Sequence, residues 1–147
     1  MNWPLTFFVT NLPVNCGGRT NLFVIRIPEK YKGDVSKQKH EEQHVWQWFT
    51  FFLLFGVLGL IAMYIPSLVA FKQFSLIIGL LFGAAVHPAL YTIYKPYRQW
   101  AEAKAYKVQM GLPDLTGHQF TLDEAAFELS TTYNLGITID QAKVALQ

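Results

Sequence analysis

The chain has 147 residues and a net charge of +2, which is too small to indicate a nucleic-acid-binding protein. Its single cysteine, Cys16, excludes an internal disulfide. Apolar residues make up 52% of it and charged residues only 15%. This composition is too apolar for a soluble domain of this length, and it indicates a single membrane-associated unit.

The first part of the chain, 1–36, predicts a β-rich and otherwise irregular segment. Thr6–Thr10 and Asn21–Pro28 are rich in β-branched and aromatic residues, and a cluster of turn residues separates them. We expect these two runs to pair as a hairpin. Met1–Val14 lacks a positively charged start and contains prolines, so we expect no cleavable signal peptide and membrane insertion through internal segments.

The most informative pattern is H-E-x-x-H at residues 40–44. On a helix, residues four apart are offset by only about 40° around the axis. His40 and His44 therefore point the same way and can hold one metal ion, and Glu41 can take a proton from water at that metal. The alternative is a polar, charged start of a helix whose two histidines lie at a membrane surface.

The motif leads directly into the uncharged apolar run Val45–Ile65, in which Gln47 is the strongly polar residue. Asp34 or Ser36 can cap a helix that begins near Lys37 and continues through this run. The run spans about 31 Å as a helix, enough to cross the hydrocarbon core of a bilayer. A buried core helix is the alternative, but the rest of the chain is too short to cover it on all sides.

A second uncharged run, Phe74–Tyr94, is also long enough to span a bilayer. Gly79 and Gly83 within it allow two helices to pack closely in lipid. Pro88 removes a backbone donor and predicts a kink. His87 beside it is either an intramembrane polar contact or a proton relay or substrate contact.

Aromatic and basic residues gather at the same end of both runs, which predicts a two-helix transmembrane hairpin with both termini cytoplasmic. Lys72 is the only basic residue in the sequence of the loop between the runs. The basic residues that flank the hairpin are Lys30, Lys32, Lys37 and Lys39 before the first run and Lys95, Arg98, Lys104 and Lys107 after the second.

The hairpin is extended by an amphipathic helix, Tyr97–Met110, which supplies a candidate third metal ligand. A catalytic zinc site needs three protein ligands and an open position. Antiparallel pairing places Glu102 within a turn of His40, whereas His87 lies about 12 Å deeper than His44. Glu102 is therefore the predicted ligand, and an ordinary surface helix that carries a glutamate is the alternative.

The C-terminal part predicts a small helical region. Thr121 begins a capping box for a helix that runs to about Tyr133. Thr138 or Asp140 can cap a second, short helix that ends near the C-terminus. The complete expectation is a mainly α, integral membrane protein in three regions: 1–36, 37–110 and 111–147.

The pairing of H-E-x-x-H with the later segment Ala101-Glu102-Ala103-Lys104-Ala105-Tyr106 resembles the gluzincins, a group of zinc metallopeptidases. It is also similar to small membrane-associated metallopeptidase-like proteins encoded by bacteria and their phages. The resemblance implies that His40, His44 and Glu102 bind Zn²⁺, that Glu41 is the general base, and that Tyr106 hydrogen-bonds a metal ligand or a tetrahedral intermediate. It also implies that an extended strand before the motif, here Phe23–Pro28, lines the substrate cleft.

Two functions are consistent with these patterns. The first is a membrane-embedded zinc metallopeptidase that hydrolyses peptide bonds of a peptide or protein substrate at the surface of the bacterial inner membrane. The second is a non-enzymatic membrane or phage virion protein with a structural or vestigial metal site, whose partners are copies of itself or other virion proteins. A structural site is closed by four protein ligands, whereas a catalytic site keeps one position open.

Overall fold

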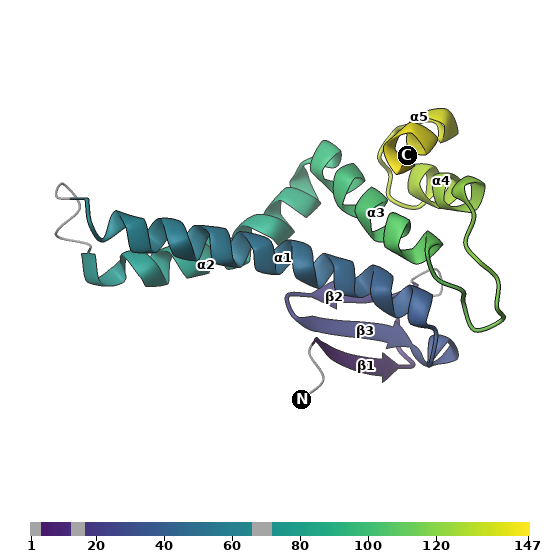
Figure 1. The fold of residues 1–147 in the computed structure, drawn as a ribbon, viewed down its shortest axis with the longest axis horizontal. Helices are drawn as coiled ribbons and strands as arrows, with labels where there is room; N and C mark the ends of the chain where they lie inside the picture. Colours follow the sequence, from purple (N-terminus) through teal and green to yellow (C-terminus); the bar gives the residue numbers. More distant parts are fainter. Residues whose placement is uncertain (1–3, 13–16, 66–71) are drawn as a thin grey trace.

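A computed structural model describes residues 4–12, 17–65 and 72–147, and it is mainly helical, as predicted (Figure 1). Cys16 lies outside these described residues. Two short edge strands, a central strand and a single 3₁₀ turn precede the helices. The elements are β1 Leu5–Val9, β2 Arg19–Asn21, β3 Val24–Pro28, the turn Glu29–Tyr31, α1 Val35–Ala62, α2 Lys72–Ile93, α3 Lys95–Met110, α4 Leu122–Thr131 and α5 Ile139–Leu146.

The sheet has the order β1-β3-β2, so the predicted hairpin between the two β-rich runs is wrong. β3 pairs in parallel with β1, and its antiparallel partner is β2. A tight connection at Leu22, whose φ is 58°, joins β2 to β3. Closing this short loop loses less chain entropy than closing the longer loop from β1, so β2 takes one edge of β3 and β1 takes the other.

The sheet packs against the first half of α1 through a small core of Ile25, Ile27 and Val45, all fully buried. Asp34 caps this helix by accepting a hydrogen bond from the Lys37 N–H at 3.0 Å. The helix then runs without interruption through the H-E-x-x-H residues and into the apolar run. The motif is therefore fixed to both the sheet and the apolar helix.

The second half of α1 pairs with α2 to form a long projection, which we call the rod (Figure 1). Glycines allow the two backbones to touch. A Cβ on Gly79 would lie 2.3 Å from the carbonyl oxygen of Phe55, and one on Gly59 would lie 2.5 Å from that of Ser75. The predicted close packing of an antiparallel helical hairpin is therefore confirmed.

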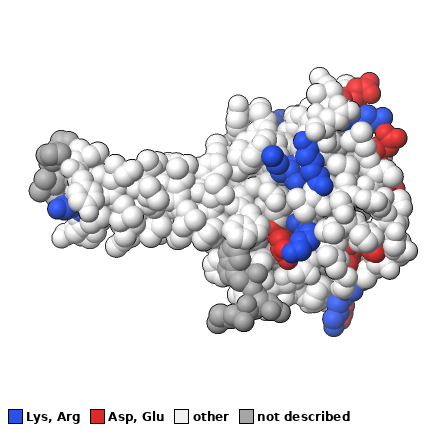
Figure 2. All heavy atoms as spheres, in the orientation of Figure 1, with Lys and Arg blue, Asp and Glu red and all other residues white. Residues whose placement is uncertain are grey.

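Both helices of the rod are long and apolar enough to cross a membrane, and most of their apolar surface is uncovered. Only 28% of the most apolar window of α1 and 11% of that of α2 are buried. Charged side chains gather on the broad end of the molecule, whereas the rod is almost free of them (Figure 2). Its exposed side chains include Leu53, Leu54, Val57, Leu58, Ile61, Ile77, Ile78, Leu81 and Phe82.

The chain turns sharply after α2, and α3 comes back against α1 (Figure 1). Tyr94 is extended, and a proline follows in the first turn of α3, so a new helix starts there. Arg98 secures the turn, because its Nε donates to the Tyr91 carbonyl at 2.7 Å and its Nη1 to the Tyr133 carbonyl at 3.3 Å.

Two C-terminal helices cover the outer side of α3. The predicted capping box at Thr121 is present, although α4 ends at Thr131 rather than near Tyr133. Of the two predicted caps of the last helix, Thr138 is the one observed, and it also forms a capping box with Gln141. Together with α3 these helices form a second core, which holds α3 in place against α1. Its fully or nearly fully buried members are Ala103, Tyr106, Ala125, Ala126, Leu129, Leu135, Ala142 and Leu146.

Candidate metal centre

His40, His44 and Glu102 converge at one point between α1 and α3, although Glu102 is distant in sequence. The Nε2 atom of His40 lies 3.4 Å from one carboxylate oxygen of Glu102, and the Nε2 atom of His44 lies 3.4 Å from the other. The three potential ligand atoms all lie within 4.8 Å of one another. All three side chains are buried, Glu102 with 1% of its surface exposed.

These separations fit a metal ion. Tetrahedral zinc with bonds of about 2.0–2.1 Å keeps its ligand atoms about 3.3 Å apart. The Oε2 atom of Glu102 is buried and has no hydrogen-bond partner among the described residues, so an ion at this point would satisfy it. Two imidazoles and one carboxylate are a donor set that suits zinc.

Small residues bring Glu102 close to the motif. Ala101 and Ala105 are fully buried beside it, so the backbone of α3 can approach α1. Gln47 links the two helices, because its amide nitrogen donates to the Ala101 carbonyl at 2.9 Å. Its amide oxygen lies 3.0 Å from Nδ1 of His44. That contact favours the tautomer with hydrogen on Nδ1 and leaves Nε2 free to bind a metal.

The Glu102 carboxylate is held in its charged form. Burial alone would raise the pKa of this carboxyl, but the adjacent imidazoles of His44 and His40 hold it well below its usual value. The Tyr91 hydroxyl also donates a hydrogen bond to Glu102 Oε1. Glu102 can therefore act as an anionic ligand with a fixed orientation.

Glu41 lies next to the triad but belongs to a different set of contacts. Its Oε2 accepts a hydrogen bond from the Thr20 hydroxyl of β2 at 2.5 Å. A Cβ on Gly18 would lie 2.4 Å from Glu41 Oε1, so the chain before β2 passes very close to this carboxylate. β2 therefore positions Glu41, whereas α1 and α3 together supply the three candidate metal ligands.

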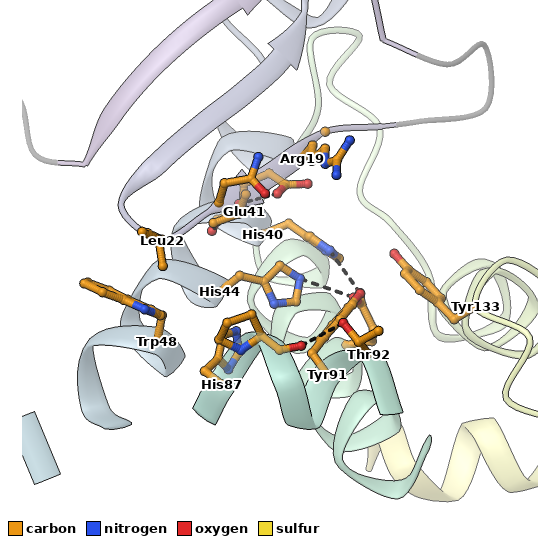
Figure 3. A pocket seen from close by; sticks show the side chains of 15 residues that line it. Arg19, Leu22, His40, Glu41, His44, Trp48, His87, Tyr91, Thr92 and Tyr133 are labelled. Carbon is orange, nitrogen blue, oxygen red and sulfur yellow. Dashed lines mark hydrogen bonds and ion pairs between the residues drawn. The ribbon is translucent and has the colours of Figure 1, made fainter. Parts of the chain in front are cut away.

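A pocket of about 390 Å³ opens beside these groups (Figure 3). β2 forms one wall and the C-terminal half of α2 forms another. This corrects the expectation that Phe23–Pro28 lines the cleft: β3 is the central strand of the sheet, so the edge strand β2 lies at the pocket. The lining residues are Gly18, Arg19, Thr20, Asn21, Leu22, His40, Glu41, His44, Trp48, His87, Pro88, Tyr91, Thr92, Glu102 and Tyr133.

The remaining sequence candidates, Tyr106 and His87, lie near the triad in different ways. The Tyr106 ring packs edge-on against His40, with 4.7 Å between ring centroids, and its hydroxyl lies 3.3 Å from that of Tyr133. His87 lines the pocket but is outside the triad, and its Nδ1 lies 2.6 Å from the Tyr97 hydroxyl.

Sequence patterns do not connect four further residues near the triad with the motif: Gly18, Thr20, Gln47 and Tyr133. The sequence places Gly18 and Thr20 in a turn cluster and Tyr133 at a helix end. Gln47 carried a usable signal, because a buried amide in an otherwise apolar run needs a partner. The other three come from distant parts of the chain, and no local pattern connects them with the motif.

Comparison of the chain with protein families, with curated protein sequences and with solved structures found no match.

Proposed function

We propose that this protein is an integral membrane zinc metallopeptidase, with the α1–α2 rod crossing the membrane and the metal centre hydrolysing peptide bonds at the cytoplasmic surface. The observation that carries the proposal is the convergence of His40, His44 and Glu102 beside Glu41 in an open pocket. An H-E-x-x-H sequence can occur by chance, but convergence with a buried, ionised glutamate from another helix is a much more demanding coincidence.

The arrangement favours a catalytic over a structural metal site. Among the described residues three side chains meet as potential ligands, and a fourth protein ligand is not among them. The pocket borders the triad and leaves room for water and substrate. Structural zinc sites are usually closed by four protein ligands. This supports the peptidase over a virion protein with a structural ion.

Each side chain then has a defined role. His40, His44 and Glu102 would hold the ion, which supplies Lewis-acid chemistry and activates water. Glu41 accepts the proton of the attacking water and delivers it to the leaving amine. The Tyr133 hydroxyl, which contacts Tyr106, donates a hydrogen bond to the carbonyl oxygen under attack. Burial raises the pKa of both phenols, so they stay protonated donors.

The membrane part of the proposal rests on the surface of the rod. Its exposed leucines, isoleucines and phenylalanines form an apolar surface of the kind that marks a site of membrane or protein interaction. His40 and His44 lie in the first half of α1, before the apolar part that forms the rod, so the triad lies at the end of the rod that adjoins the rest of the molecule. Insertion of the rod would therefore place the metal centre at the membrane surface.

The test combines metal analysis with proteolysis. Protein purified in detergent should contain about one zinc ion per chain, and it should cleave unstructured peptides. Glu41→Gln keeps the shape of the side chain and all three ligands, so it should retain zinc and lose about 10²–10⁴ in rate. Protein without zinc, or a Glu41→Gln variant as active as the parent, would contradict the proposal.

A further inference from the structure

The pocket has two chemically different ends. At one end lie Arg19 and Tyr133, which come from β2 and from the segment after α4 (Figure 3). At the other end lies Trp48 of α1, and the lining also includes Pro88 of α2. Leu22 at the tip of the β2–β3 hairpin lies on the same side of His44 as Trp48, and Tyr133 lies on the opposite side (Figure 3).

The apolar end lies deeper along the rod than the metal ligands. Trp48 is one helical turn beyond His44, which moves it about 6 Å toward the uncharged part of α1. His87, the residue before Pro88, has its ring 6.2 Å from that of Phe51, which lies further still along α1. The pocket therefore extends from the metal centre into the segment that the proposed function places in the membrane.

The rim at this end is apolar and exposed. Leu22 has 43% of its surface exposed, and Pro88 is exposed on the facing helix. The neighbouring Phe23 is 40% exposed, and its ring centroid lies 6.2 Å from that of Trp48. The hairpin tip therefore touches the base of the rod, and the rim of the pocket is continuous with the apolar surface of the rod.

From this continuity we propose that the substrate is a polypeptide bound at the point where it leaves the bilayer, with an apolar membrane segment on one side of the cleaved bond. Its apolar side would lie against Leu22, Trp48 and Pro88, and its polar side would pass Arg19 and Tyr133. A fully polar peptide would leave the apolar end without a matching surface. This inference rests on the proposed function and specifies the substrate class.

The test measures binding by the Glu41→Gln variant, loaded with zinc and reconstituted in phosphatidylcholine–phosphatidylglycerol nanodiscs. Two fluorescent peptides share one polar tail. In the first peptide the tail continues into a leucine–alanine transmembrane segment, and in the second it continues into a polar segment of equal length.

The variant Leu22→Asn removes apolar contact at the rim, and asparagine tolerates the positive φ of this position. Leu5→Asn is the matched control, because Leu5 is also 43% exposed on the sheet but lies outside the pocket lining.

We expect Leu22→Asn to weaken binding of the transmembrane peptide about tenfold and Leu5→Asn to leave it unchanged, because an apolar side chain of this size contributes about 1.4 kcal/mol or more when buried. Peptide partitioning into the lipid is the same for both variants.

Three outcomes would overturn the inference: equal effects of the two variants, equal affinity for both peptides, or binding of neither peptide. If the parent protein cleaves the polar peptide as well as the transmembrane one, the peptidase stands and only the substrate class fails. If the transmembrane peptide binds as expected but no peptide is cleaved, the proposed activity fails instead.

Discussion

At the scale of single residues, the candidate metal centre depends on side chains that fix the direction of its potential ligands. Gln47 does this for His44, because it contacts Nδ1 of the imidazole and the backbone of α3 at once. Thr20 and Gly18 do the same for Glu41. Two substitutions separate these roles.

Gln47→Leu should weaken zinc binding about 10–100-fold, because His44 loses the contact that fixes its tautomer and orientation. Competition with a chromophoric zinc chelator measures this affinity. Gln119→Leu is the matched control: Gln119 also donates to a backbone carbonyl, that of Met110 at 2.8 Å, but it does not line the pocket. Equal zinc affinity of the parent and Gln47→Leu proteins would remove Gln47 from the site.

Gly18→Ala should lower the rate of peptide cleavage and leave zinc content unchanged. The new Cβ would lie 2.4 Å from Glu41 Oε1, so the carboxylate must move away from its position while the three ligands stay in place. The expected loss in kcat/KM is about 10²-fold, the lower range for loss of a general base. Gly111→Ala, whose Cβ would have its nearest contact at 3.4 Å, serves as the control. Loss of zinc in Gly18→Ala would show that this glycine supports the ligands instead.

At the scale of elements, the kink residue of α2 explains an unusual tryptophan contact. Pro88 has no N–H, so the carbonyl of Ala84, one turn earlier, loses its helical hydrogen bond. The indole N–H of Trp48 donates to this carbonyl at 3.0 Å. The proline in α2 and the tryptophan in α1 therefore form one unit, which also shapes the apolar end of the pocket.

A double-mutant cycle tests this coupling. Trp48→Phe should destabilise the parent protein by about 1–3 kcal/mol, because the Ala84 carbonyl is left without a donor in an apolar environment. In a Pro88→Ala background the backbone N–H is restored, and Trp48→Phe should cost clearly less. Unfolding in mixed detergent micelles with increasing dodecyl sulfate measures both free-energy differences. An equal cost of Trp48→Phe in the two backgrounds would show that the indole does not act through this carbonyl.

At the scale of the whole molecule, the charged broad end and the uncharged rod predict a single orientation in the membrane. The positive-inside rule places both termini in the cytoplasm and the far end of the rod outside. Single-cysteine labelling in a Cys16→Ser background tests this arrangement. Tyr64, with 83% of its surface exposed near the far end of the rod, and Val144, 73% exposed in α5, are suitable positions.

Tyr64→Cys should react with a membrane-impermeant maleimide in intact cells, whereas Val144→Cys should react only after permeabilisation. The reverse pattern would place the metal centre on the outer surface. Labelling of neither residue before permeabilisation, together with extraction of the protein by alkaline carbonate, would show that the rod does not span the membrane.

Several features could be predicted from the sequence because their causes are local. The two uncharged runs and the caps at Thr121 and Thr138 follow from side-chain polarity and backbone preferences over a few residues. The metal triad could also be predicted, although Glu102 is distant in sequence. The i, i+4 spacing fixes His40 and His44 on one helix face, and antiparallel helix pairing brings Glu102 to the same level.

Only the tertiary structure decided how the strands pair and what surrounds the triad. Each β-rich run can pair with several others, and loop entropy and burial against α1 select the order β1-β3-β2. This order brings β2, rather than the longer β3, to the pocket, and with it Thr20 to Glu41. The sharp turn into α3, held by Arg98, also places the Tyr106–Tyr133 pair beside the triad. Contacts between distant segments depend on all the surfaces that pack together, and no short stretch of the sequence contains that information.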